Sequence, residues 1–87
     1  MAIHLTIQGR VQGVFYRDWT VETARSLDLA GWVRNLPDGT VEAHLEGDAG
    51  VIRAMITKMH DGPPRAAVTR ISESPAEHQG LSTFERR

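Results

Sequence analysis

The sequence has no cysteine among its 87 residues, which excludes disulfide bonds and thiolate chemistry. It has no apolar run that approaches the ~20 residues needed to span a membrane, and its N-terminus lacks the basic and apolar regions of a signal peptide. The formal net charge is −1, so no basic excess favours a nucleic-acid partner. We therefore expect a cytoplasmic protein that binds neither membranes nor nucleic acids.

Groups typical of the common catalytic and metal sites are also scarce. No Ser-His-Asp set is recognisable, and the histidines lack the spacing of metal ligands. These histidines are His4, His44, His60 and His78. His44 alternates with Glu42 and Glu46 along a predicted strand, and we interpret that face as solvated rather than as a metal site. We expect the protein to use no metal and no cofactor.

A length of 87 residues with 40% hydrophobic content predicts a single domain, 1–87, with a small core. Apolar periods of strand and helix type alternate along the chain. They predict, in order, a strand Ile3–Gln8, a helix Asp18–Leu29, a strand Gly31–Asn35, a turn at Pro37-Asp38-Gly39, a strand Val41–Glu46, a helix from Asp48 to Gly62-Pro63-Pro64, a strand from Ala66 to Ile71, a polar loop Ser72–Ser82 and a short strand Thr83–Arg86.

Two local signals refine these elements. Asp18 and Asp48 stand where each helix begins, and we interpret both as N-caps. The apolar spacing shifts by one residue between Val68 and Ile71, which predicts a β-bulge or an early end of that strand.

The order βαββαβ is that of the split βαβ unit in ferredoxin-like folds. We predict an α+β sandwich in which an antiparallel or mixed sheet carries two helices on one face. The first and second strands are then parallel, and the third lies antiparallel between them. Their carboxyl ends share one edge of the sheet, which places residues 9–17 beside Asn35.

The junction between the first strand and the first helix reads Gly-Arg-Val-Gln-Gly-Val-Phe-Tyr-Arg over residues 9–17. A glycine-containing loop that opens a helix can direct several backbone N–H groups at one anion. Arg17 adds a planar, permanently charged fork that suits phosphate oxygens. The spacing fits neither a P-loop nor a dinucleotide-binding fingerprint. Taken alone, the two glycines more often mark a simple strand-to-helix turn.

The whole run, however, resembles the signature G-x-V-Q-G-V-x-[FY]-R of the acylphosphatase family. The matching residues are Gly9, Val11, Gln12, Gly13, Val14, Tyr16 and Arg17. Further matching blocks are 31–35, 38–42 and 62–66 followed by Val68, in the family's order and spacing. The resemblance covers nearly the full chain. Phe15 departs from it, because this variable position often holds a small residue.

These residues suit one reaction, the hydrolysis of small acyl phosphates by direct water attack without a metal. Phosphoryl transfer depends mainly on positioning and charge stabilisation, and a carboxylate leaving group, with a pKa of ~4.3, needs no general acid. We expect Arg17 and Asn35 to be catalytic, with Arg17 holding the phosphoryl oxygens and Asn35 orienting the water. The resemblance implies the same two roles. The predicted phosphate-binding residues are Gln12, Gly13, Val14, Phe15, Tyr16 and Arg17.

Other functions of the same fold stay open at this point. One is a non-catalytic module that binds phosphate or carbamoyl phosphate. Another is single-stranded RNA binding, which needs aromatic residues on central strands that the first and third strands lack. We expect a monomer with a small acyl phosphate as substrate and inorganic phosphate or sulfate as a competing anion. Turnover separates an enzyme from a binding module.

Overall fold

The computed structural model describes residues 1–87 and contains two helices and five strands. In chain order the elements are β1 (Ala2–Arg10), α1 (Tyr16–Ser26), β2 (Ala30–Asn35), β3 (Val41–Glu46), α2 (Ala49–Asp61), β4 (Ala67–Pro75) and β5 (Phe84–Arg86). The predicted order βαββαβ, with a short last strand, is confirmed.

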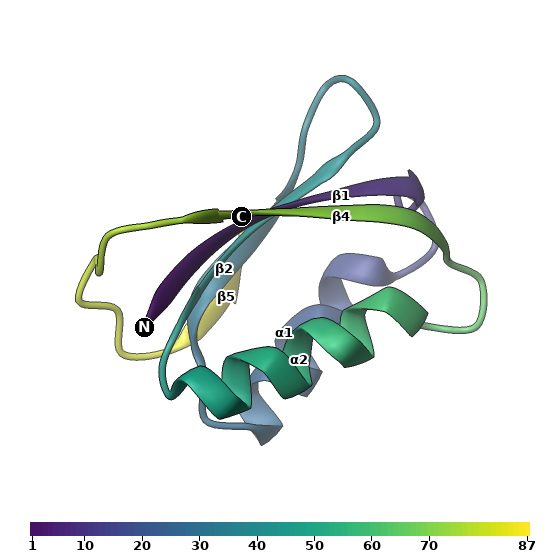
Figure 1. The fold of residues 1–87 in the computed structure, drawn as a ribbon. Coiled ribbons are helices and arrows are strands. Elements are labelled where there is room, and N and C mark those ends of the chain that lie inside the picture. Colours follow the sequence, from purple (N-terminus) through teal and green to yellow (C-terminus); the bar gives the residue numbers. More distant parts are fainter.

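The strands form one mixed sheet in the order β4-β1-β3-β2-β5. β3 lies antiparallel between β1 and β2, while β5 joins the outer side of β2 in parallel. Both helices cover the same face of the sheet (Figure 1). This is the predicted ferredoxin-like sandwich. Neither helix has the length and apolar character that crossing a membrane would require.

The core lies between the helices and the inward face of the sheet. Alternate residues of each strand supply it, because side chains of a strand point to opposite faces in turn. From β1 and β3 these residues are Ile3, Leu5, Ile7, Val41, Ala43 and Leu45. From α2 they are Ile52, Met55, Ile56 and Met59, at helical spacing.

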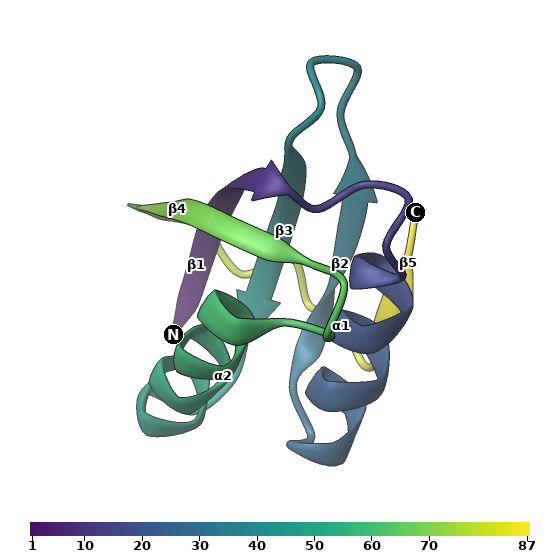
Figure 2. The same cartoon turned by 90° about the vertical axis from the view of Figure 1, so that its right-hand side faces the viewer.

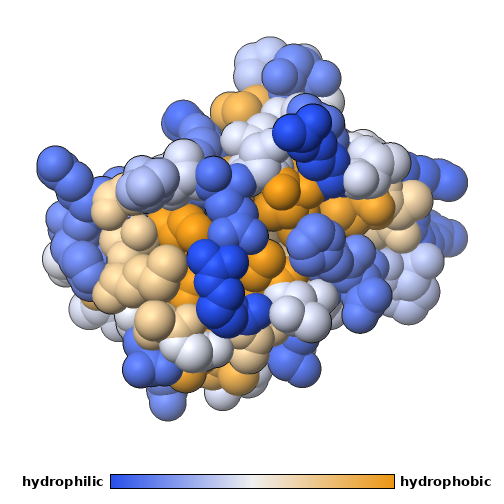
Figure 3. All heavy atoms as spheres, viewed as in Figure 1, coloured by the Kyte–Doolittle hydropathy of each residue, from blue (hydrophilic) through white to orange (hydrophobic).

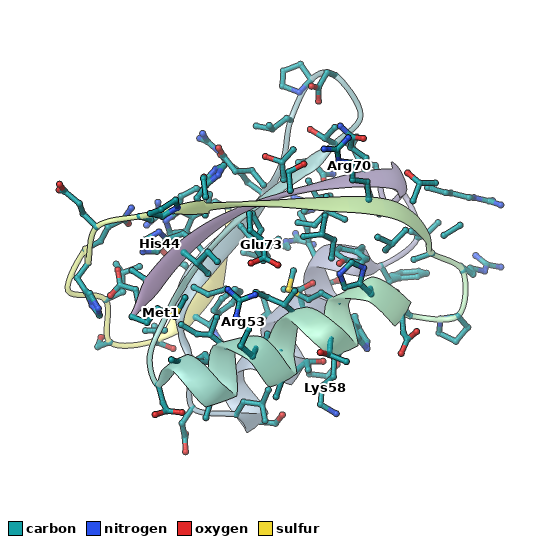
Figure 4. The ribbon with its side chains drawn as sticks, viewed as in Figure 1. Met1, His44, Arg53, Lys58, Arg70 and Glu73 are labelled. Atoms are coloured by element: carbon teal, nitrogen blue, oxygen red, sulfur yellow. The ribbon has the colours of Figure 1, made fainter.

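Apolar atoms reach the surface where the sheet meets α2, as the orange patches of Figure 3 show. An ion pair crosses this line. Arg53 of α2 and Glu73 of β4 point toward each other (Figure 4), with Nη1 of the arginine 2.6 Å from Oε1 of the glutamate. Exposed pairs of this kind contribute little to stability.

Several predicted boundaries were wrong, among them the end of α1, which was predicted at Leu29 and lies at Ser26. α1 begins at Tyr16 after an N-cap at Phe15, so Asp18 lies in the first turn and is not the cap. Asp48 does cap α2, since its carboxylate accepts the N–H of Val51 at 3.1 Å. The predicted polar loop also begins later, because Ser72–Pro75 continues β4 opposite β1. Backbone pairing to β1 holds this segment despite its polar side chains.

The predicted bulge is present and shapes the end of β1. Gln8 pairs with Arg70 and Gly9 with Val68, so Thr69 has no partner of its own. Gly9 has φ of 121°, and a Cβ there would lie 2.2 Å from the carbonyl oxygen of Ala67. Only glycine fits this close approach, and the chain leaves the sheet directly after it.

The interpretation of the His44 face as solvated was wrong. His44 and Glu46 are only 2% and 4% exposed, because residues 76–82 fold over this outer face of the sheet. The Glu46 carboxylate accepts the backbone N–H of Gln79 and lies 2.6 Å from Nε2 of His44. Trp32 stacks on His44 with ring centroids 6.0 Å apart. Glu46 thus holds the segment that leads into β5.

This buried carboxylate makes stability depend on pH. Burial is the largest single influence on the pKa of Glu46, and it raises this pKa. The N–H donors of Gln79 and Leu81 and the ring of His44 act in the opposite direction. Together they outweigh burial, so the pKa of Glu46 lies below its ordinary value of 4.5. Because the pKa of Glu46 is lower in the folded state, its ionised carboxylate stabilises the folded protein above pH 4.5. This contribution to the free energy of unfolding is lost as pH falls through the folded-state pKa.

We therefore expect Glu46→Gln to lower the free energy of unfolding by ~1–3 kcal/mol near neutral pH. The difference from wild type should shrink below pH 4.5, where the wild-type carboxylate also becomes protonated. Urea unfolding of both proteins across this range measures it. A difference that stays constant with pH would contradict the assignment.

Candidate functional site

A pocket of about 240 Å³ opens at the edge of the sheet where β1 and β2 end. Its lining residues are Val11, Gly13, Phe15, Tyr16, Arg17, Asp18, Asn35 and Arg86. The structure therefore brings the loop after β1 together with Asn35 of β2, as the topology predicted. Gln12 and Val14, also predicted as phosphate-binding residues, do not line this pocket.

The loop from Val11 to Phe15 has an unusual backbone. Gly13 has φ of 73°, and no atom would lie within 4 Å of a Cβ at this position, so conformation rather than space favours glycine. Phe15 is left-handed as well, with φ of 66° and ψ of 21°. This conformation is uncommon for a bulky residue and costs of order 1–3 kcal/mol. The Phe15 side chain is 67% exposed at the pocket rim.

This conformation leaves the loop with free hydrogen-bond donors. The backbone N–H groups of residues 12–16 donate to no backbone acceptor, and no side chain accepts from them. They come at the N-terminus of α1, whose dipole also favours negative charge. Consecutive N–H groups around a left-handed residue form a concave site for an anion.

Buried side chains hold this loop in place. Val11 and Val14 are 1% and 3% exposed, and the Tyr16 ring lies in the core. The Tyr16 hydroxyl donates to the carbonyl oxygen of Met59 in α2 at 2.8 Å. Burial raises the pKa of Tyr16, so its hydroxyl stays protonated. The bond to Met59 directs this hydroxyl toward α2. Tyr16 thus leaves its backbone N–H without a protein partner and places its side chain in the core.

Gln12 has a role that sequence reasoning missed. Its side-chain Nε2 donates to the carbonyl oxygens of Leu36 and Thr40, at 2.8 Å each. These two residues flank the tip of the β2–β3 hairpin that follows Asn35. Gln12 therefore ties the loop to the hairpin and fixes the position of one relative to the other. Its backbone N–H has no partner in the protein.

Arg17 lies in the first turn of α1 and is partly buried. Its Nη1 donates to the main-chain oxygen of Arg87 at 3.3 Å, the only hydrogen bond of its side chain. Figure 2 shows the C-terminus beside the start of α1, in agreement with this contact. A guanidinium has five N–H donors, so most of the Arg17 fork is free to bind an anion in the pocket.

Asn35 is the last residue of β2. Its Oδ1 is the one buried side-chain oxygen or nitrogen in the molecule without a hydrogen-bond partner. A buried acceptor that stays unpaired costs ~1–3 kcal/mol, so such atoms need an explanation. The pocket beside it supplies one, because a water or ligand there can donate to Oδ1.

Asp18 and Arg86 are pocket residues that the sequence analysis did not identify. Nη1 of Arg86 lies 3.0 Å from Oδ1 of Asp18, and both side chains are about half exposed. Asp18 carries no motif of its own and was interpreted as a cap. The one signal for Arg86 is the alternation that makes it face inward with Phe84, two residues earlier.

Comparisons with known proteins agree with this fold. The sequence matches the acylphosphatase family model over residues 3–86. It is 53% identical to the acylphosphatase of Thermococcus kodakarensis over 81 residues, which covers 93% of this chain and 89% of the relative. It is 49% identical to that of Acidiphilium cryptum over 87 residues, covering 100% and 96%. The crystal structure of acylphosphatase from Bacillus subtilis superimposes with a TM-score of 0.95 at 32% identity, covering 99% of this chain and 97% of that one.

Proposed function

The chain belongs to the acylphosphatase family, and from this premise we propose that it hydrolyses small acyl phosphates by direct attack of water on phosphorus, without a metal. The observation that carries the proposal is one pocket with two complementary sides. One side holds Arg17 and three residues with free N–H groups, Gly13, Phe15 and Tyr16, and the other holds Asn35 with its unpaired Oδ1.

The phosphoryl group binds in a cradle formed by the free N–H groups of the loop and the guanidinium of Arg17. N–H groups of residues 12–16 donate to its oxygens, and the fork of Arg17 binds two of them side by side. Charge on these oxygens is stabilised by donors that are already in place, so little reorganisation is needed during the reaction. Inorganic phosphate and sulfate fit the same cradle and compete with substrate.

Asn35 positions the attacking water by accepting a hydrogen bond from it at Oδ1. The water oxygen then bonds to phosphorus, and the bond between phosphorus and the acyl oxygen breaks. The carboxylate leaves with the bonding electron pair and needs no general acid, because its conjugate acid has a pKa of ~4.3. One water proton stays on the oxygen that has joined phosphorus, and the other passes to a phosphoryl oxygen, since Asp18, the one carboxylate side chain that lines the pocket, is paired with Arg86. We assign the enzyme to the cytoplasm as a monomer.

Phosphate release from benzoyl phosphate in the presence of EDTA tests this function. We expect turnover at the same rate with and without the chelator, because no step of the mechanism uses a metal. Binding of phosphate without turnover would instead establish a non-catalytic module. Turnover that EDTA abolishes, and that added Mg²⁺ restores, would contradict the metal-free mechanism.

Phosphate and sulfate should also stabilise the folded protein, because they bind the folded state alone. At a concentration ten times the Kd, the linkage amounts to ~1.4 kcal/mol, about 6–11 °C in Tm for a domain of this size. Differential scanning fluorimetry with sodium sulfate, and with sodium chloride at matched ionic strength, measures the shift. An equal shift in both salts would remove the cradle from the account.

A further inference from the structure

Arg86 occupies a position where the strand pattern calls for an apolar residue. Phe84 and Arg86 share one face of β5, and Phe84 is fully buried in the core. In the parallel register Arg86 lies opposite Val33, which is also fully buried. The Arg86 side chain therefore points to the helix-covered side of the sheet, where it lines the pocket with Arg17 and Asn35.

The guanidinium of Arg86 has unused donors in this pocket. Its one hydrogen bond runs to Oδ1 of Asp18 at 3.0 Å, and its side chain is 51% exposed. An arginine fork has five donors, so a second acceptor can bind without breaking the contact with Asp18. Asp18 holds the fork beside the pocket, and its negative charge partly offsets the positive charge of the guanidinium.

We propose that Arg86 is a specificity-determining residue that binds an anionic group on the acyl part of the substrate. This inference rests on the proposed function. Arg17 and the loop N–H groups bind the phosphoryl end, which leaves Arg86 to face the remainder of the substrate. The preferred substrates are then acyl phosphates whose acyl part carries a negative charge, such as a free carboxylate. Acyl phosphates with an uncharged acyl part are hydrolysed less efficiently.

A matched pair of substrates isolates this contact. Succinyl phosphate carries a free carboxylate, and 4-methylpentanoyl phosphate has an isopropyl group of similar shape in its place. The preference is the ratio of kcat/KM for the first to kcat/KM for the second. Hydrolysis of the uncharged substrate by the wild-type protein reports the proposed function by itself, whatever the preference proves to be.

We expect Arg86→Met to lower the preference about fivefold, the factor that corresponds to ~1 kcal/mol for a partly exposed ion pair. Most of the loss should fall on KM for succinyl phosphate. Asp18→Asn should raise the preference, because the fork loses a competing carboxylate. Arg53→Met is the matched control, since it also removes a half-exposed arginine paired with a carboxylate, far from the pocket on α2.

Arg86 also lies on an edge strand, where an inward charge can protect against aggregation. If that were its whole role, Arg86→Met would form larger assemblies or lose activity on both substrates equally, with an unchanged preference. Either result would overturn the proposal, as would a lower preference in Asp18→Asn or an equal fall in preference in Arg53→Met.

Discussion

Replacing Arg17 with alanine is expected to remove nearly all turnover and measurable phosphate binding. Arg17 is the pocket cation that makes no ion pair with an Asp or Glu side chain, and it stands at the start of α1 beside the free loop N–H groups. Loss of one such charge-stabilising donor commonly costs ~10²–10³ in rate. Steady-state hydrolysis of benzoyl phosphate and calorimetric phosphate binding measure the two losses.

Two further variants give this prediction its controls. Arg17→Lys keeps the charge but replaces a planar fork with a point charge, so it should also lose most activity. Arg70→Ala removes an exposed arginine from β4, the edge strand on the other side of the sheet from β5, and should leave activity unchanged because Arg70 does not line the pocket. Near-full activity in Arg17→Lys would contradict a bidentate contact between Arg17 and the phosphoryl oxygens.

Asn35→Ala is expected to separate binding from catalysis. The variant should fold and bind phosphate as the wild type does, yet lose roughly 10² in kcat, because misplacing a reacting group by about 1 Å can cost that factor. Ground-state binding of phosphate does not report the orientation of a water. Single-turnover hydrolysis beside calorimetric binding distinguishes the two.

The stability of Asn35→Ala provides an independent check. Oδ1 of Asn35 has no protein partner, and no hydrogen bond of its side-chain amide holds the hairpin. Its removal should therefore leave the free energy of unfolding unchanged or slightly higher. A large loss of stability with activity falling in proportion would show that Asn35 only shapes the turn. A folded variant with unchanged kcat would show that Asn35 does not position the attacking water.

The sequence predicted the meeting of the loop and Asn35 because topology alone fixes it. Once β1 and β2 are parallel neighbours of β3, their carboxyl ends share an edge whatever the side chains are. Gly9 and Gly13 could likewise be identified as special positions. The reason for Gly9, an approach of 2.2 Å to the carbonyl of Ala67, needs the β4 register and could not be read from the sequence.

The remaining pocket and the outer face could not be predicted because they depend on the last third of the chain. Residues 76–82 have no strong pattern, yet they cover His44 and Glu46 and turn an expected solvated face into a buried one. The same segment delivers β5, and with it Arg86, to the start of α1. Gln12 matched the family signature, but only the hairpin contacts show what its side chain does.

The central claim is that water attacks phosphorus directly in the pocket between Arg17 and Asn35. Hydrolysis of benzoyl phosphate in water enriched in heavy oxygen, with EDTA present, tests it most directly by mass spectrometry of the products. We predict that the label enters inorganic phosphate and not benzoate, and that Asn35→Ala slows its entry without weakening phosphate binding. Label in benzoate would mean that water attacks the acyl carbon, which would contradict both the cradle's role and the position of the water.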